Sequence, residues 1–209
     1  MLVPIHEEIT REALGIRVNP RALEVIIAAN RKQDALHKQI GHDEYHFDNN
    51  AIDAGHRYIN EQRGHVLAAL LAPGVLSAWI AFGRLTHAAQ DFYAHTNYVS
   101  MWFDAHAHSD TPPAPLEIDP VQKSLIESPK IRSGRIYLPL DMLYFVPFLR
   151  KFSLSLLPHD SHGRMNLDSP KQGLHFEYAR AAAVKRTQYE FEILEKILTP
   201  EMLAKFTGI

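Results

Sequence analysis

One short stretch of this chain limits its fold more than any other, because it places two histidines and an aspartate at intervals of four residues. These residues are His87, Asp91 and His95. On a helix this spacing stacks them on consecutive turns, with neighbouring Cβ atoms about 5–6 Å apart. A carboxylate between two imidazoles can bind two metal ions at once, so we expect Asp91 to be a bridging ligand. The alternative is a helix with two incidental histidines and a solvated aspartate.

The neighbours of this polar row favour a buried position. Three small residues, Ala88, Ala89 and Ala94, let other helices approach closely. Three larger residues, Leu85, Phe92 and Tyr93, supply apolar bulk. We therefore expect an all-α fold, a helical bundle in which residues 82–97 form the central and least exposed helix, with the polar row enclosed.

The length and composition narrow the classes of protein further. A chain of 209 residues is long enough for one well-filled domain and too short for two ordinary ones, so we expect a single domain over residues 1–209. The formal charge of −2 provides no basic surface, and stable nucleic-acid binding is not expected. Because the chain has no cysteine, its 13 histidines and its carboxylates are the groups that could hold zinc.

No segment has the pattern of a membrane span or a signal peptide. The start of the chain has neither a basic stretch nor an apolar run of signal length. The longest uncharged run, residues 66–82, is interrupted by Pro73 and Gly74, which favours two helix ends joined by a turn. We expect a cytoplasmic protein without a transmembrane segment, or an exported one if the sequence starts at a mature end.

Helix-start signals precede the central helix at three places. Pro4, followed by acidic residues, predicts a helix that ends near residue 14. Asn19 before a proline predicts the cap of a second helix that ends near residue 32. Asp48 or Asn49 is expected to cap a third helix that ends near residue 72.

Two segments after the central helix differ in character. Residues 104–135 contain several prolines and few periodic apolar residues, so we expect an excursion over the surface. Residues 137–152 are rich in leucine and aromatic residues, and we expect a helix that covers the core. A lid that faces lipid or a partner is the alternative.

The central stretch also resembles a known signature. The sequence Phe82-Gly-Arg-Leu-Thr-His-Ala-Ala-Gln-Asp-Phe-Tyr-Ala-His-Thr-Asn resembles that of the Het-C-like proteins, relatives of the zinc-dependent phospholipase C and single-strand nuclease fold. The resemblance implies a mostly helical fold with up to three zinc ions at its centre. It also implies that His87 and Asp91 hold one ion, that Asp91 bridges to a second, and that His95 serves a third.

Further ligands follow from the same resemblance. The order His6-Glu-Glu-Ile-Thr resembles the opening of the phospholipase C fold, in which this histidine holds a metal that shares the bridging aspartate. Asp34 matches by position an aspartate that ligates a metal and has been proposed as the base for the attacking water. His46 lies in a segment that resembles the His-Phe-Tyr-Asp segment of the family. These matches add His6, Asp34 and His46 to the expected metal ligands.

The last expected ligand is His175, at the start of a C-terminal helix. The order of Ser-His-Gly, Asn-x-Asp and then His-x-x-x-Ala in residues 161–179 resembles the Het-C order, so His175 is expected to join His95. The phospholipases carry a glutamate four residues after this histidine, where the present chain has Ala179. The missing oxygen ligand is expected from Asp168 or Glu177.

The function expected on this basis is hydrolysis of a phosphodiester or phospholipid substrate. Two or three zinc ions would activate a shared water and stabilise the leaving group, with Asp34 as the catalytic base. An alternative is a catalytically weak or inactive helical scaffold that metal stabilises and that binds a partner or lipid. A third interpretation is a helical protein that is simply rich in histidine. The expected metal ligands are His6, Asp34, His46, His87, Asp91, His95 and His175.

Overall fold

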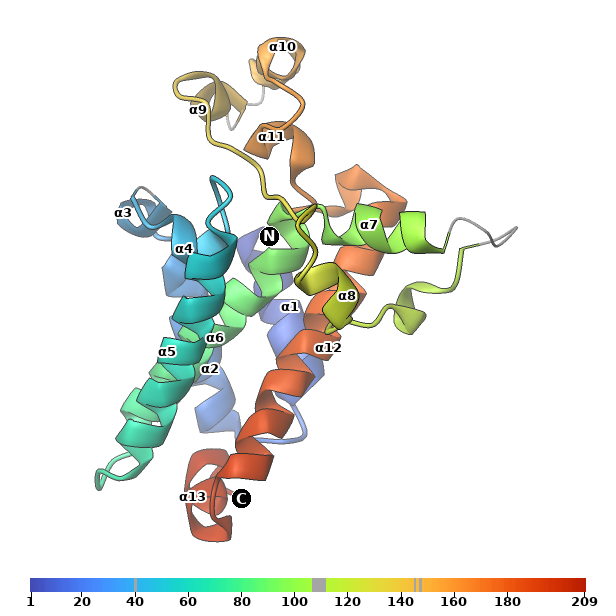
Figure 1. The fold of residues 1–209 in the computed structure, drawn as a ribbon. Helices are drawn as coiled ribbons and strands as arrows, with labels where there is room; N and C mark the ends of the chain where they lie inside the picture. Colours follow the sequence, from blue (N-terminus) through green and yellow to red (C-terminus); the bar gives the residue numbers. More distant parts are fainter. Residues whose placement is uncertain (40, 107–111, 145, 147) are drawn as a thin grey trace.

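The computed structural model describes residues 1–39, 41–106, 112–144, 146 and 148–209 (Figure 1). The described residues are mainly helical, and their only β-type pairing is two isolated bridges, Thr96 with Ser133 and Arg135 with Ser161. The expected all-α fold is confirmed.

The helices before the long central one hold three of the seven expected ligands, His6, Asp34 and His46. These helices are α1 (Val3–Leu14), α2 (Pro20–Arg31), η1 (Lys32–Asp34), α3 (Leu36–Gln39), α4 (Asp43–His46) and α5 (Ile52–Leu70). The central helix and those after it are α6 (Leu76–His95), α7 (Tyr98–Ala105), η2 (Pro115–Glu117), α8 (Lys123–Ile126), α9 (Leu140–Tyr144), α10 (Arg150–Leu156), α11 (His162–Met165), η3 (Pro170–Gln172), α12 (Leu174–Ile197) and α13 (Pro200–Thr207). No described helix combines the length and apolar character needed to cross a membrane.

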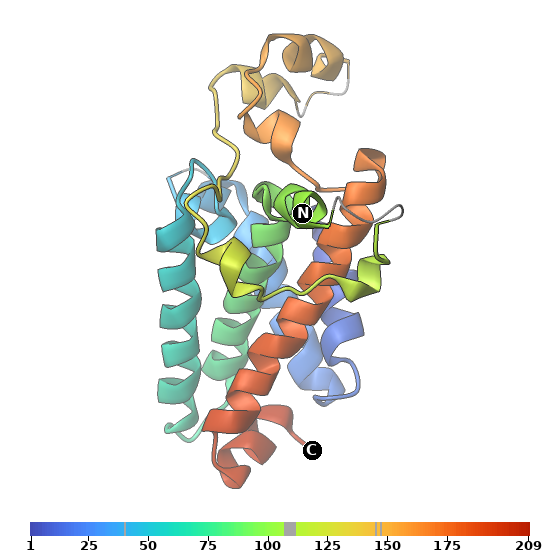
Figure 2. The same cartoon turned by 45° about the vertical axis from the view of Figure 1, so that its right-hand side comes forward.

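Helix α6 runs through the middle of the bundle, between α5, α2 and α12 (Figures 1 and 2). Every residue from Leu85 to His95 is buried, as expected for a helix whose neighbours are small or apolar on nearly every side. The helix starts six residues earlier than predicted and ends two residues earlier. It ends because Thr96 has extended backbone angles, φ −106° and ψ 167°.

A glycine lets α2 lie directly against α6. A Cβ atom added at Gly83 would lie 2.3 Å from the carbonyl oxygen of Ile26 and 2.7 Å from the Cβ of Ala29. The two backbones are therefore as close as they can be at this point. The close approach places Asn30, near the end of α2, beside the polar row of α6.

The end of the bundle away from the polar row is apolar. The rings of Phe82, Phe191 and Phe206 pack against one another, with centroids 5.4–6.4 Å apart. The indole Nε1 of Trp79 donates to the carbonyl of Phe206 at 2.6 Å, which attaches α13 to α6. Ordinary aromatic packing thus stabilises this end.

The predicted cap of α2 is confirmed, but that of α5 is wrong. The side chain of Asn19 accepts from the backbone N–H of Ala22 at 2.7 Å. Helix α5 begins at Ile52 with Ala51 at its N-cap and no side-chain cap. Asp48 does not cap it, because its carboxylate accepts from the imidazole of His162 instead.

The turn between α4 and α5 has an uncommon backbone. Phe47, Asn49 and Asn50 all have positive φ values, between 51° and 60°. The amide side chain of Asn50 accepts from the N–H of Ser133 at 2.8 Å, and the N–H of Asn49 donates to the carbonyl of Gly134 at 2.9 Å. These contacts hold residues 133–136 against the turn, beside the end of α6.

The segment expected to be a surface excursion crosses α7 and α12 where it is described, and residues 107–111 of it lie outside the described residues. Ile118 and Leu125 of this segment are buried against the bundle. The expectation of a core-covering helix at 137–152 is wrong for the described part, which excludes residues 145 and 147. Helices α9 and α10 extend away from the bundle, and Phe148 is 82% exposed. Prolines divide the segment, so it forms two short helices in place of one long helix.

Candidate metal centre

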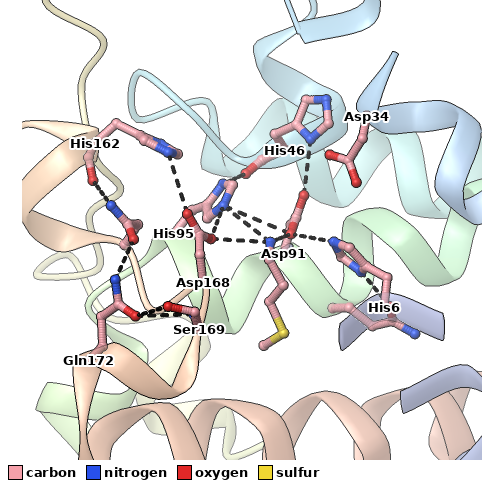
Figure 3. A network of polar contacts seen from close by, with 12 residues as sticks. His6, Asp34, His46, Asp91, His95, His162, Asp168, Ser169 and Gln172 are labelled. Atoms are coloured by element: carbon pink, nitrogen blue, oxygen red, sulfur yellow. Dashed lines mark hydrogen bonds and ion pairs between the residues drawn. The ribbon is translucent and has the colours of Figure 1, made fainter. Parts of the chain in front are cut away.

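Acidic and histidine side chains from several segments meet at the end of α6 that carries the polar row (Figure 3). They form two adjoining groups, and Asp91 of the first group lies 3.9 Å from His95 of the second. We call the first the inner cluster; it consists of His6, Asp34, His46, His87 and Asp91. We call the second the outer cluster; it consists of Asp48, His95, His162 and Asp168.

Three atoms of the inner cluster form a nearly equilateral triangle. Nδ1 of His46 and Nε2 of His87 each lie 3.0 Å from Oδ2 of Asp91, and they lie 3.1 Å from each other. Two ligand atoms on one tetrahedral zinc ion, at bond lengths of about 2.0–2.1 Å, are about 3.3 Å apart. The triangle therefore has the size of one face of a tetrahedral zinc site.

The remaining members of the inner cluster surround this triangle. Nε2 of His6 lies 3.2 Å from Oδ1 of Asp91, the oxygen that the triangle does not use. Oδ1 of Asp34 lies 3.9 Å from Nε2 of His87. Nε2 of His46, Nε2 of His6 and Oδ2 of Asp34 are all buried without a hydrogen-bond partner. Buried polar atoms without partners are rare, and a bound cation is one explanation for them.

The orientation of His6 is set by a chain of hydrogen bonds that runs through Gln90 to two threonine hydroxyls. The hydroxyls of Thr10 and Thr187 donate to helix carbonyls at 2.8 Å, so each can accept a hydrogen bond from the amide Nε2 of Gln90. This arrangement turns Oε1 of Gln90 toward Nδ1 of His6, at 2.7 Å. Because an amide oxygen only accepts, Nδ1 of His6 donates to it, and Nε2 is the ring nitrogen that faces Asp91.

His87 is oriented in the same way from α2. The hydroxyl of Thr86 donates to a helix carbonyl and accepts from Nδ2 of Asn30, at 3.2 Å. Oδ1 of Asn30 then faces Nδ1 of His87 at 3.3 Å. Nδ1 of His87 donates to it, so Nε2 presents a lone pair to Asp91. Fixing one ring nitrogen of a histidine through an outer hydrogen bond is typical of metal-binding histidines.

The outer cluster lies where α6 ends. Nδ1 of His95 lies 2.8 Å from the carbonyl oxygen of His46 and 3.3 Å from Oδ1 of Asp48. Nε2 of His95 lies 3.1 Å from Oδ1 of Asp168. Nδ1 of His162 lies 2.9 Å from Oδ1 of Asp48, and its ring meets that of His95 edge to face at 4.6 Å.

The amino group of Met1 is buried between the two clusters. It forms an ion pair with Oδ1 of Asp91 and lies 3.3 Å from Oδ1 of Asp168 and 3.4 Å from Nε2 of His95. Burial alone would lower the pKa of this amino group, but Asp91, Asp168 and Asp34 together raise it to about 11. A positive charge is therefore stabilised at this point.

The carboxylates around the amino group stay ionised in spite of burial. Burial opposes the ionisation of Asp91, but the amino group of Met1 and the imidazoles of His95 and His87 outweigh it and hold its pKa well below the usual range. The pKa of Asp168 is lowered in the same way by Met1 and His95. Both carboxylates are thus available as anionic ligands at neutral pH.

The pKa values of two buried histidines, His87 and His95, shift in opposite directions. Burial lowers the pKa of His87 to about 4 and outweighs the attraction of Asp91, so this imidazole is neutral at physiological pH. Burial also acts to lower the pKa of His95, but Asp91 and Asp48 outweigh it and raise the value well above the usual range. Without metal, His95 therefore carries a proton on the nitrogen that faces Asp91 and Asp168.

Six of the seven expected ligands come together in the structure, and His175 does not. His175 is exposed, and its ring lies against that of Phe103, 4.8 Å away. The expectation that it joins His95 is therefore corrected. It fails because α12 begins at Leu174 and turns the side chain of His175 outward, while Phe176 and Tyr178 face the core.

Sequence reasoning missed two members of the outer cluster and left a third open. Asp48 was expected only as a helix cap, His162 had no assigned role, and Asp168 was one of two alternatives. A backbone bridge between Arg135 and Ser161 brings His162 to the site, and the N–H of Leu167 donates to the carbonyl of Ala94 at 2.8 Å. The only local signal was the short spacing of histidine, asparagine and aspartate in residues 162–168.

Comparison with protein families finds similarity over part of the chain. A family model described as the VWA7 N-terminal domain matches residues 9–111, just under half of the 209 residues. The matched residues include most of the inner cluster, whereas His6, His162 and Asp168 lie outside them. No curated protein and no solved structure matches the chain.

This result corrects the expected family and function. The matching family is not one of the phospholipase C and nuclease fold, so the assignment to the Het-C-like branch is wrong. The expected phosphoesterase function and phospholipase C-like character depended on that assignment and are wrong with it. The stretch at residues 82–97 was misleading because a four-residue spacing of polar side chains follows from helix geometry and is not specific to one family.

Proposed function

We propose that this chain is a zinc-binding helical domain whose ion is held in the inner cluster. The observation that carries the proposal is the triangle of His46 Nδ1, His87 Nε2 and Asp91 Oδ2, with sides of 3.0–3.1 Å. Asp34 is the fourth ligand, since its Oδ1 lies 3.9 Å from Nε2 of His87 and its Oδ2 is buried without a partner. Nε2 of His6 lies beside Oδ1 of Asp91, the carboxylate oxygen that is not part of the triangle.

The hydrogen-bond arrangement supports a cation in preference to an empty polar core. The lone pair on Nε2 of His87 points at Oδ2 of the ionised carboxylate of Asp91, 3.0 Å away, and two such atoms repel each other unless a proton or a metal ion lies between them. The low pKa of His87 means that a proton is absent there at neutral pH. A metal ion removes the repulsion.

Zinc fits the ligand types better than other common ions. Imidazole nitrogen and carboxylate oxygen in a tetrahedral arrangement are typical of zinc, whereas calcium and magnesium prefer sites made of oxygen alone. Here, imidazoles outnumber carboxylates in the triangle by two to one. Asp34 is proposed as a ligand, since its expected role as a catalytic base depended on phosphoester hydrolysis.

The proposed role of the ion is to join segments that are distant in the sequence. His6 lies on α1, Asp34 ends η1, His46 ends α4, and His87 and Asp91 lie on α6. Successive residues from His6 to His87 are separated by 28, 12 and 41 positions along the chain. An ion that binds them only when the chain is folded stabilises the fold by its binding free energy.

Metal analysis of protein purified without a histidine tag tests the proposal. We expect at least one zinc ion per chain by mass spectrometry. If the free ion is present at about a thousand times its dissociation constant, binding adds about 4 kcal/mol, and removal by a chelator should lower the melting temperature by about 8–16 °C. Asp91→Asn keeps the shape of the side chain but removes its charge, so it should lose zinc and melt at a lower temperature.

Asp53→Asn is the matched control, because Asp53 is an exposed carboxylate in the first turn of α5 and belongs to neither cluster. It should retain zinc and melt within about 4 °C of wild type, because a first-turn carboxylate contributes at most about 1 kcal/mol through the helix dipole. Wild-type protein that binds no zinc, or that melts at the same temperature with and without chelator, would disprove a structural ion in the inner cluster.

A further inference from the structure

The outer cluster has the features of a second metal site with ligands that differ from those expected from the sequence. We propose that it binds a second divalent ion through Nε2 of His95, Nε2 of His162 and the carboxylate of Asp168. In this site Asp48 is a positioning residue that orients both imidazoles. The proposal rests on the proposed function, since the two sites share the surroundings of Asp91.

The orientation of His95 decides which of its nitrogens can bind metal. Nδ1 faces two oxygen atoms that can only accept, the carbonyl of His46 at 2.8 Å and Oδ1 of Asp48 at 3.3 Å. Nδ1 therefore carries a proton and donates. Nε2 is the nitrogen available to a metal, and it lies 3.1 Å from Oδ1 of Asp168, 3.9 Å from Oδ1 of Asp91 and 3.4 Å from the amino group of Met1.

His162 is oriented by the same carboxylate. Its Nδ1 lies 2.9 Å from Oδ1 of Asp48 and donates to it, which leaves Nε2 as the available nitrogen, 4.0 Å from Oδ2 of Asp168. Asp48 thus accepts from two imidazoles whose other nitrogens face one aspartate. A carboxylate that holds the far side of a histidine is a common partner of metal-binding histidines.

This arrangement separates Asp48 from the ligands, although it lies within 4.8 Å of both imidazoles. If Asp48 bound the ion together with Nδ1 of His95, the hydrogen bond from that nitrogen to the carbonyl of His46 would be lost. Buried carbonyls without a donor cost free energy, so the outward-facing Nε2 atoms are the better ligands.

The backbone at Asp168 is held in place by hydrogen bonds to two other segments. The N–H of Leu167 donates to the carbonyl of Ala94 at 2.8 Å, and the N–H of Leu2 donates to the carbonyl of Asp168 at 3.1 Å. These bonds place its carboxylate between His95 and His162, with 14% of the side chain exposed. Oδ1 of Asp168 lies 3.1 Å from Nε2 of His95, which matches the separation of about 3.3 Å expected for two ligands of one zinc ion. Oδ2 of Asp168 lies 4.0 Å from Nε2 of His162, a longer distance that a small rotation of the carboxylate or the imidazole would shorten.

The polypeptide around His162 is held in place as well. Its N–H donates to the carbonyl of Arg135 at 2.7 Å, and the N–H of Gly163 donates to Oδ1 of Asp141 at 2.9 Å. A Cβ atom at Gly134 would lie 2.6 Å from Cα of His162, so only glycine lets these two segments approach this closely. The site is therefore built from ordered segments.

Counting bound metal in point variants tests the second site. Protein dialysed against Zn²⁺ and then against metal-free buffer should hold two ions per chain. His162→Asn and Asp168→Asn should each reduce this number to one, with helix content unchanged by circular dichroism. If His162→Asn does not fold, Asp168→Asn still tests the second site. Asp168 lies at the rim of the cluster, so its replacement disturbs the core less.

Two histidine variants serve as controls. His159→Asn changes an exposed histidine three residues before His162, and His175→Asn changes the ligand expected from the sequence. Both should retain two ions. Loss of an ion in His175→Asn, or two ions in both His162→Asn and Asp168→Asn, would overturn the proposed ligand set.

Cobalt spectroscopy tests the role of Asp48. In a titration with Co²⁺, Asp48→Asn should weaken binding of one equivalent by about 10–100-fold and shift its visible absorption, while the other equivalent keeps the wild-type spectrum. An unchanged spectrum and affinity for both equivalents would exclude a positioning role. Wild-type protein without any bound ion would disprove the proposed function itself, whereas one inner ion that His162→Asn and Asp168→Asn leave in place would disprove only the second site.

Discussion

Three threonine hydroxyls determine how the inner cluster presents its imidazoles. Thr10, Thr86 and Thr187 each donate to a helix carbonyl and so act as acceptors for amide groups. Through Gln90 and Asn30 they set which nitrogen of His6 and His87 carries the proton. The proposed metal binding therefore depends on neutral residues that lie outside the proposed ligand set.

Replacing Gln90 tests this dependence at the scale of one residue. Gln90→Leu leaves Nδ1 of His6 without an acceptor, so we expect zinc affinity to fall by about 10–100-fold. Leaving a buried donor unpaired should also lower the free energy of unfolding by about 1–3 kcal/mol. Competition with a chromophoric chelator measures the affinity, and urea unfolding measures the stability.

Gln62→Leu is the matched control, because Gln62 is also a buried glutamine, on α5, and its Oε1 has no partner. Its replacement should leave zinc affinity unchanged. Equal zinc affinities for wild type and Gln90→Leu would show that the orientation of His6 does not matter for binding.

At the scale of the element, α6 combines two requirements that usually conflict. Its centre must pack closely against three other helices, and one of its faces must carry charged and polar ligands. Small residues solve the first problem, since Gly83 lets the backbone of α2 approach until Asn30 reaches His87. The four-residue spacing solves the second by placing His87, Asp91 and His95 on one face.

Gly83→Ala tests whether this close approach is needed. The added methyl group would lie 2.3 Å from a backbone oxygen of α2, and backbone cannot move aside as a flexible side chain does. We expect a loss of about 1–3 kcal/mol in the free energy of unfolding, in spite of the better helix propensity of alanine.

Gly64→Ala provides the comparison, because nothing lies within 4 Å of a Cβ at this exposed position of α5. There the same substitution should stabilise the protein by about 0.5–1 kcal/mol. Denaturant unfolding of both variants measures the difference, and a stabilised Gly83→Ala variant would contradict the close contact.

At the scale of the whole molecule, the two ends of the bundle are stabilised by different forces. The rings of Phe82, Phe191 and Phe206 form an apolar end that needs no ion. The opposite end gathers ionised carboxylates and histidines, and its stability depends on positive charge between them. We expect metal removal to affect these ends unequally.

Hydrogen exchange with and without chelator measures this difference. Removal of zinc should lower amide protection at least tenfold in the first half of α1, in α4 and in residues 166–170, since these segments supply ligands or pack beside them. Amides of α13 should exchange at unchanged rates, because α13 packs on the apolar end. Equal changes in α13 and α4 would mean that the ion acts on global stability alone.

Much of the fold was predictable because it depends on local periodicity. The apolar and small residues around His87, Asp91 and His95 predict a buried central helix, and α6 is one. Asn19 predicts the start of α2 in the same way, since a cap is a contact between residues three positions apart. The family could not be read from the same stretch, because helix spacing alone does not distinguish families that place polar residues on a buried helix.

The sequence by itself determined the helical class, the central helix and the polar row on one face of it, because these follow from contacts within a few residues. Only the tertiary structure decided that His162 and Asp168, and not His175, lie beside His95, and that Asp48 serves the cluster and not a helix cap. These arrangements depend on contacts between segments 26 to 83 residues apart, such as the backbone bridge of Arg135 with Ser161 and the hydrogen bond from the N–H of Ser133 to the side-chain oxygen of Asn50. Contacts at such separation leave no periodic pattern in the sequence.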